Sequence, residues 1–147
     1  MAPPHTDRFD LTGRVSLVTG ATKGLGRAMV QGLAEAGSDV VVVSRKLDLC
    51  EQVAAEVAES TGRRALPLAC HMGEWDAIPE LVDRVYKEFG RIDVLVNNAG
   101  INPAMTPITE ISEAYFDKLC SVNLKGPLRL AALVAPRMGE HGGGSII

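Results

Sequence analysis

Three glycines in residues 19–26 have the spacing of a loop that could hold a phosphate group. Gly20, Gly24 and Gly26 follow the apolar run 15–18 and precede an amphipathic stretch, so the segment is predicted to lead from a strand into a helix. A helix N-terminus presents unpaired N–H groups and a positive dipole end, which favour an anion. Gly20 would permit the turn, and the other two would let a backbone or a phosphate come close. The pattern predicts a site for a dinucleotide pyrophosphate, with an ordinary tight turn as the structural alternative.

The residues after the next apolar run indicate which nucleotide would bind. A nucleoside-triphosphate loop, G-x-x-x-x-G-K-[ST], does not fit, because its second glycine would fall on Leu25. A dinucleotide site for NAD usually has an acid after the second strand, whereas an arginine there suits a 2′-phosphate. This chain has Ser44, Arg45 and Lys46 at that place, and Lys23 adds charge from the glycine loop. These residues favour a phosphate site over the alternative of solvated cations.

Strand and helix patterns alternate along the chain and would position these loops. The predicted strands are 15–19, 39–44, 65–69 and 92–97, with the opening of a fifth in the last residues. The predicted helices are 25–36, 47–60, 75–89 and 112–137, the last with a bend near Asn123. Leu49, Val53 and Val57 are predicted to share one face, and Trp75, Ile78, Val82, Val85 and Phe89 to face inward. This alternation predicts an α/β fold, a doubly wound parallel sheet.

Composition sets the broad class of protein. The 147 residues are 46% hydrophobic and carry a net charge of −3, which indicates a globular domain and argues against a nucleic-acid partner. Cys50, Cys70 and Cys120 fit no disulfide framework, and no metal site is predicted. No segment has the pattern of a signal peptide or a membrane span, so a cytoplasmic location is expected. Residues 1–8 are predicted to be a flexible tail and residues 9–147 one dinucleotide-binding domain.

Together with two further motifs, the glycine loop resembles the short-chain dehydrogenase/reductase family. Its pattern T-G-x-x-x-G-x-G matches Thr19, Gly20, Gly24 and Gly26, N-N-A-G matches Asn97, Asn98, Ala99 and Gly100, and V-N matches Val122 and Asn123. The order and spacing agree over residues 9–147. The segments C-H-M-G and S-R-K are similar to a carbonyl- and retinal-reductase-like branch.

The resemblance implies a Rossmann fold and hydride transfer between NADP(H), favoured over NAD(H), and a small carbonyl or alcohol substrate. His71 stands where the family commonly has an acid that meets adenine, and an ordinary loop histidine is the alternative. The predicted cofactor-binding residues are Thr19, Gly20, Thr22, Lys23, Gly24, Leu25, Gly26, Ser44, Arg45, Lys46, His71, Met72, Asn97, Ala99 and Gly100.

The resemblance also implies a catalytic serine, a Tyr-x-x-x-Lys pair and an asparagine. Only Asn123 matches, since Gly90 and Leu119 stand four residues after Tyr86 and Tyr115. The fold is therefore expected to be truncated after the start of the fifth strand, and this chain alone to be inactive.

The alternatives are a non-catalytic dinucleotide-binding module and an interaction partner of full-length relatives. The apolar segment 123–136 could lie in its own core or in a homo-oligomer interface.

Overall fold

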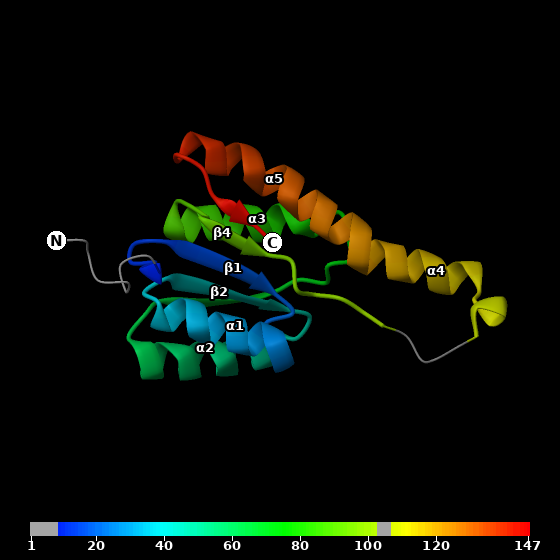
Figure 1. Cartoon of the computed structure of the whole chain (residues 1–147), viewed down its shortest axis with the longest axis horizontal. Coiled ribbons are helices and arrows are strands. Elements are labelled where there is room, and N and C mark those ends of the chain that lie inside the picture. Colours follow the sequence, from blue (N-terminus) through cyan, green and yellow to red (C-terminus); the bar gives the residue numbers. More distant parts are fainter. Residues whose placement is uncertain (1–8, 103–106) are drawn as a thin grey trace.

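Five parallel strands form the centre of the molecule (Figure 1). The computed structural model describes residues 9–102 and 107–147, so the tail predicted for residues 1–8 lies outside the described part. The strands are β1 (Val15–Thr19), β2 (Asp39–Ser44), β3 (Ala65–Ala69), β4 (Val94–Val96) and β5 (Ser145–Ile146). Their order in the sheet is β3-β2-β1-β4-β5, and every pairing is parallel. The predicted doubly wound Rossmann-type sheet is confirmed.

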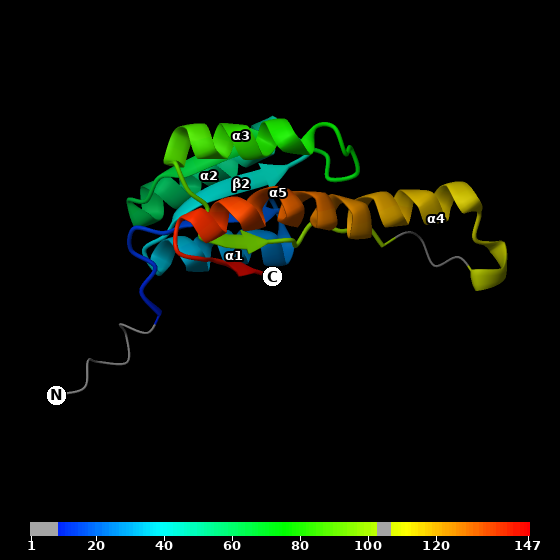
Figure 2. The same ribbon diagram turned by 90° about the horizontal axis from the view of Figure 1, so that it is seen from above.

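Helices cover both faces of the sheet (Figure 1). The helices are α1 (Gly24–Glu35), α2 (Leu47–Thr61), α3 (Ile78–Phe89), α4 (Glu113–Cys120) and α5 (Gly126–Glu140), with a short 3-10 turn, η2 (Ile108–Glu110), before α4. Helices α1 and α2 lie on one face, and α3 and α5 on the other. A π-helical segment, η3 (Ser121–Lys125), joins α4 to α5, and α4 extends past the sheet (Figure 2).

Two apolar cores form because the central strands are buried on both faces. Alternate residues of β2 point to opposite sides, so Val41 and Val43 pack with α3 and α5, whereas Val40 and Val42 pack with α1 and α2. All four valines are 0% exposed. The continuous β-branched run therefore gives β2 its place inside the sheet.

The inward orientation predicted for Trp75 is wrong, and Leu49 lies outside the core that Val53 and Val57 join. Trp75 is 43% exposed because α3 begins only at Ile78, with Pro79 in its first turn, and the Arg129 guanidinium lies 4.8 Å from the centre of the indole ring. Leu49 is 40% exposed, and Cys50 at 0% takes the buried position beside it. Apolar spacing identified these helices, but Trp75 precedes the first turn of α3 and Leu49 lies in the first turn of α2.

The apolar segment 123–136 is divided between the core and the surface. Leu130 and Val134 are buried against α3 and the sheet, whereas Leu124 and Leu128 are 62% and 60% exposed. The bend predicted near Asn123 coincides with the π-helical segment. Within residues 9–102 and 107–147, no helix combines the length and hydropathy that crossing a membrane requires.

Helix α1 packs directly on the turn that leaves β1. A Cβ atom added to Gly26 would lie 2.2 Å from the carbonyl oxygen of Gly20 and 2.5 Å from Nδ2 of Asn98. Gly32, in the same helix, has no atom within 4 Å of the corresponding position. Gly26 is thus required for packing, and Gly32 is not.

A buried carboxylate joins β1 to β4 at the end of the sheet where these strands begin. Asp93 is 5% exposed and accepts hydrogen bonds from Arg14 Nη1 at 2.9 Å, from Arg91 Nε at 2.8 Å and from the Val15 N–H at 2.9 Å. Burial by itself would raise the pKa of Asp93, but the bonds from Arg91, Val15 and Arg14 outweigh it and lower the pKa below its ordinary value of 3.8. The carboxylate is therefore ionised when the protein is folded at neutral pH.

We expect Gly26→Ala to lower the free energy of unfolding by about 1–3 kcal/mol, because the added methyl must displace backbone. Gly32→Ala is the matched control and should raise it by about 0.5–1 kcal/mol, because alanine restricts the unfolded chain. Urea denaturation measures both. Equal effects of the two substitutions would contradict the proposed packing.

We expect Asp93→Asn to lower the free energy of unfolding by about 1–3 kcal/mol near pH 7. Since the folded-state pKa is depressed, the carboxylate stabilises the fold fully above about pH 4. That contribution is lost as the pH falls through the folded-state pKa, so the difference between the variant and the parent protein should close in acid.

The control is Asp83→Asn, which removes an exposed partner of Arg137 and should cost less than about 0.5 kcal/mol. Urea denaturation at several pH values provides the comparison. A constant loss in Asp93→Asn down to about pH 2 would show that the depressed pKa is not the cause.

Candidate functional site

A cleft lies at the carboxyl ends of the central strands, where open parallel sheets bind ligands. Its volume is about 540 Å³, within the range of sites for small molecules and cofactors. It is lined by Gly20, Thr22, Lys23, Ser44, Arg45, Lys46, Leu49, Cys70, His71, Met72, Ala99, Gly100, Ile101, Asn102 and Val122. The loops after β1, β2, β3 and β4 therefore converge on one place, as the sequence predicted.

The turn between β1 and α1 supplies one wall of the cleft. Gly20 has φ +65° and Gly24 has φ +53°, a left-handed conformation that glycine adopts without strain. The N-terminus of α1 at Lys23 has no side-chain cap, and no acidic residue lies in its first turn. Its N–H groups and dipole are thus available to an anion.

The segment after β4 holds this turn in place. Asn98 Nδ2 donates hydrogen bonds to the carbonyl oxygens of Thr19 at 3.0 Å and Gly20 at 3.2 Å. The Ala99 N–H donates to the Thr19 hydroxyl at 3.0 Å, and that hydroxyl donates to the Val96 carbonyl at 3.4 Å. Asn98 is a site residue absent from the predicted set, although the N-N-A-G motif contains it.

Three cations gather at the cleft without carboxylate partners. Lys23, Arg45 and Lys46 line it, and in the described part of the chain no ion pair includes any of them. The Ser44 hydroxyl accepts a hydrogen bond from the Cys50 thiol at 3.3 Å and donates a long one, at 3.4 Å, to the Lys46 carbonyl. This arrangement suits a phosphate group at the end of β2.

The loop after β3 brings a histidine and a thiol to the cleft. The Gly73 N–H donates to Nδ1 of His71 at 3.0 Å, which fixes the orientation of the ring. Burial, followed by the charges of Glu74 and Glu80, raises the pKa of Cys70 to about 11. Cys70 is therefore a neutral thiol at physiological pH and is not a reactive nucleophile.

Asn123 binds main chain with both ends of its amide. Its Oδ1 accepts from the Ile101 N–H and its Nδ2 donates to the Ile101 carbonyl, each at 2.8 Å. The residue lies in the π-helical segment η3. The side chain thus ties the loop after β4 to the helix that follows.

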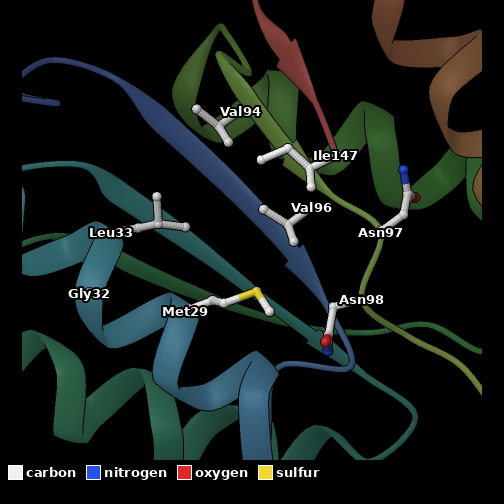
Figure 3. Close-up of a pocket in the computed structure, with 8 residues that line it drawn as sticks. All are labelled: Met29, Gly32, Leu33, Val94, Val96, Asn97, Asn98 and Ile147. Carbon is white, nitrogen blue, oxygen red and sulfur yellow. The ribbon is translucent and has the colours of Figure 1, made fainter. Parts of the chain in front are cut away.

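Several predicted residues lie outside the lining of the cleft. Thr19 and Gly26 are buried beneath it, Gly24 begins α1, and Leu25 is 74% exposed. Asn97 lines a second, mainly apolar pocket of about 580 Å³ between α1 and β4. Met29, Gly32, Leu33, Val94, Val96, Asn98 and Ile147 complete this pocket (Figure 3).

Neither tyrosine is placed to act as an acid or a base in the cleft. Tyr86 and Tyr115 are not among its lining residues. Burial raises the pKa of the Tyr86 phenol, and the neighbouring Arg137 only partly opposes this rise. A raised phenol pKa is the opposite of what a general base at neutral pH needs.

The residues present fit a dinucleotide. The uncapped helix end suits a pyrophosphate, the cations at the end of β2 suit a ribose phosphate, and the loop after β3 can meet a purine. Among the described residues, no group of three or more His, Cys, Asp or Glu side chains could hold a metal ion.

Comparison with known proteins agrees with this geometry. The family model described as short chain dehydrogenase matches residues 14–147. Dehydrogenase/reductase SDR family member 4 of Caenorhabditis elegans is 37% identical over 145 residues, which are 99% of this chain and 55% of the relative. The chain thus spans about half the length of the curated relatives it matches.

Two solved structures illustrate the fold with a cofactor bound. L-Sorbose reductase from Gluconobacter frateurii, complexed with NADPH and L-sorbose, has a TM-score of 0.90 and 31% identity, covering 94% of this chain and 52% of that one. NAD⁺-bound xylitol dehydrogenase has a TM-score of 0.86 and 31% identity, covering 92% of this chain and 52% of the other. Sequence, fold and site agree, and this chain belongs to the short-chain dehydrogenase family.

Proposed function

We propose that this chain is the dinucleotide-binding portion of an NADP(H)-dependent oxidoreductase acting on a small carbonyl or alcohol. The observation that carries the proposal is the convergence at one cleft of the glycine turn, the loop after β4 and three cations that form no ion pair with any described residue. A bound nicotinamide dinucleotide would supply or accept the hydride. The cytoplasmic location expected from the sequence stays a prediction.

The residues of this chain would hold the cofactor by its phosphates and its base. The N-terminus of α1 would bind the pyrophosphate, while Gly20 keeps the backbone turn close to it. Arg45, aided by Ser44 and Lys46, would bind the 2′-phosphate. His71 and Met72 would contact the adenine end, and Gly100 and Ala99 the ribose side.

NADP(H) is preferred over NAD(H) in this proposal because no acid stands at the end of β2. An NAD site usually places a carboxylate there for the ribose 2′-hydroxyl, whereas this chain has Ser44, Arg45 and Lys46. The relatives support either cofactor, since sorbose reductase is complexed with NADPH and xylitol dehydrogenase with NAD⁺. The local charge therefore decides the preference.

The 147-residue chain alone would bind the cofactor without turning it over. Asn123 is the one member of the family's catalytic set in this sequence, and its side-chain amide is already bonded to Ile101. No tyrosine in the chain has a lysine four residues after it. The chain thus lacks a phenol and ammonium pair to exchange a proton with the substrate oxygen.

A homo-oligomer or a complex with full-length relatives is a second candidate role. The exposed side chains of Leu124 and Leu128, together with Phe116 at 58% exposure, favour it. Leu124 lies on η3 and Leu128 on α5. Phe116 lies on α4, the helix that extends past the sheet (Figure 2). Such apolar surface commonly marks a protein contact.

We expect Arg45→Ala to weaken NADPH binding about 10- to 100-fold, because it removes a charged hydrogen bond to the 2′-phosphate. NADH binding should stay within about twofold of the parent protein. Titration with both nucleotides, followed by fluorescence, measures the two constants. Arg84→Ala, on the exposed side of α3, is the matched control. Equal affinity of the parent protein for NADPH and NADH would refute the preference for NADP(H).

We expect the purified chain to bind NADPH but to show no family-like turnover with aldehydes, ketones or alcohols. General acid–base catalysis typically contributes about 10²–10⁴-fold, and the groups that would supply it are missing. Nicotinamide absorbance follows the reaction. Turnover that copurifies with the chain and disappears in Gly24→Asp would overturn this expectation and point first to Tyr115.

A further inference from the structure

The loop between β3 and α3 forms part of the cleft wall with its first residues. His71 and Met72 line the cleft, and Met72 is buried. The loop then continues through Trp75 to Ile78, where α3 begins. The position of this wall therefore depends on what holds residues 71–77 in place.

Hydrogen bonds do not join this loop to the rest of the described chain. The Gly73 N–H donates to Nδ1 of His71 at 3.0 Å, and the Glu74 N–H donates to the His71 carbonyl at 2.9 Å. The Ala77 N–H donates to the Glu74 carbonyl at 3.1 Å. Every hydrogen bond that residues 71–76 form with a described residue stays inside the loop. Other contacts must hold the loop against the body of the protein.

The helical segments after β4 hold the loop by packing. A Cβ atom on Gly73 would lie 3.0 Å from the Ser121 hydroxyl oxygen and 3.0 Å from Cγ2 of Val122. A Cβ atom on Gly126 would lie 2.1 Å from the Met72 carbonyl oxygen. These contacts limit how closely the loop approaches η3 and α5, but they supply no charged or hydrogen-bonded link.

One cation on α5 supplies a directional link. The Arg129 guanidinium lies 4.8 Å from the centre of the Trp75 ring, within the range of an attraction between a cation and an aromatic face. Nε of Arg129 is buried and has no hydrogen-bond acceptor among the described residues, and no described carboxylate pairs with the guanidinium. The Trp75 ring is thus the described partner that fixes the head group of Arg129.

We propose that Arg129 is a positioning residue for the dinucleotide. It is absent from the lining of the cleft and acts through Trp75 on the loop that carries His71 and Met72. Without the guanidinium the loop would sample more positions, and binding would have to order it again. The apparent affinity then falls with the fraction of molecules whose loop is in place. The inference rests on the proposed function and adds a residue outside its site.

Substitutions of Arg129 test the role of its charge. Arg129→Met keeps a long unbranched side chain but removes the cation, and it should raise the dissociation constant of NADPH about fivefold, the value of one partly exposed cation–ring contact. Arg129→Lys keeps a cation and should bind within about twofold of the parent protein. The fluorescence of the reduced nicotinamide measures the constants.

Arg137→Met is the matched control, because Arg137 lies 4.7 Å from the centre of the Tyr86 ring and belongs to the same helix. Tyr86 is not among the residues that line the cleft. This variant should bind NADPH within about twofold of the parent. Urea denaturation should show a similar small loss of stability in Arg129→Met and Arg137→Met, so that stability alone does not account for a difference in binding.

The loop can also be observed directly, because Trp75 is the single tryptophan of the chain. In the nucleotide-free protein, acrylamide should quench the Trp75 emission more efficiently in Arg129→Met than in the parent. Arg137→Met should leave the quenching unchanged. This readout does not depend on whether the cleft binds a nucleotide.

A double-mutant cycle tests whether Arg129 acts through Trp75. Trp75→Leu alone should weaken NADPH binding by about the same factor as Arg129→Met. In the Trp75→Leu protein, Arg129→Met should then cause no further loss, since two residues that act as one contact are not additive. A loss that persists in that background would show that the charge acts on the nucleotide directly and would refute the positioning role.

The remaining outcomes separate the two proposals. A parent protein that does not bind NADPH refutes the proposed function together with the inference. If the parent binds NADPH, a change of less than about twofold in Arg129→Met refutes the inference alone. An equal loss in Arg137→Met, a failure of Arg129→Lys to restore binding, or unchanged acrylamide quenching in Arg129→Met refutes it as well.

Discussion

The close approach of α1 to the turn after β1 is the contact on which the site depends. The Gly20 carbonyl lies so near the helix that a Cβ atom on Gly26 would come within 2.2 Å of it. The same carbonyl accepts a hydrogen bond from Asn98 at 3.2 Å. The turn after β1, the start of α1 and the distant segment after β4 thus meet at one peptide group, which holds the open end of α1 at the edge of the sheet. The loops after β2 and β3 then complete the cleft around it.

Two groups of positively charged side chains can be distinguished, those paired with carboxylates and those that line the cleft. At the end of the sheet where β4 begins, the buried Asp93 is neutralised by Arg14 and Arg91. Other arginines on the described surface pair with carboxylates, as in Arg63 with Asp39. Within the described residues Lys23, Arg45 and Lys46 form no ion pair, although the chain carries a net charge of −3. Like charges gathered at one cleft repel one another, and this repulsion agrees with the anionic ligand proposed for it.

The family relation and the fold agree: the chain belongs to the short-chain dehydrogenase family and has its parallel sheet. The chain covers 55% of the Caenorhabditis elegans relative. In this structure the Asn123 amide forms a two-bond link with Ile101 inside a π-helical segment. Such segments are frequent at functional sites. The link connects the loop after β4, which lines the cleft, to the helical segment that carries the exposed Leu124 and Leu128.

Most of the fold could be predicted from the sequence, because its signals are local. The valine run indicated β2 and glycine spacing located the β1–α1 turn, whereas the helix predicted from residue 75 begins only at Ile78. The motifs also identified most of the residues that line the cleft, since the ends of parallel strands necessarily meet at one edge. Boundaries were less certain: Trp75 and Leu49 have apolar spacing but are 43% and 40% exposed, Trp75 against the Arg129 guanidinium and Leu49 in the lining of the cleft.

The sequence by itself determined the order of strands and helices along the chain, the glycine-rich loop after β1 and the cationic residues at the end of β2. Only the tertiary structure decided how these parts support one another. The hydrogen bonds of Asn98 span 78 and 79 residues, and those of Asp93 to Arg14 and Val15 span 79 and 78. Nδ1 of His71 accepts a hydrogen bond because the turn after β3 brings the Gly73 N–H to it. Residue type and spacing specify local conformation, whereas the partner of a buried polar group depends on which distant segments the packed sheet brings within hydrogen-bond distance.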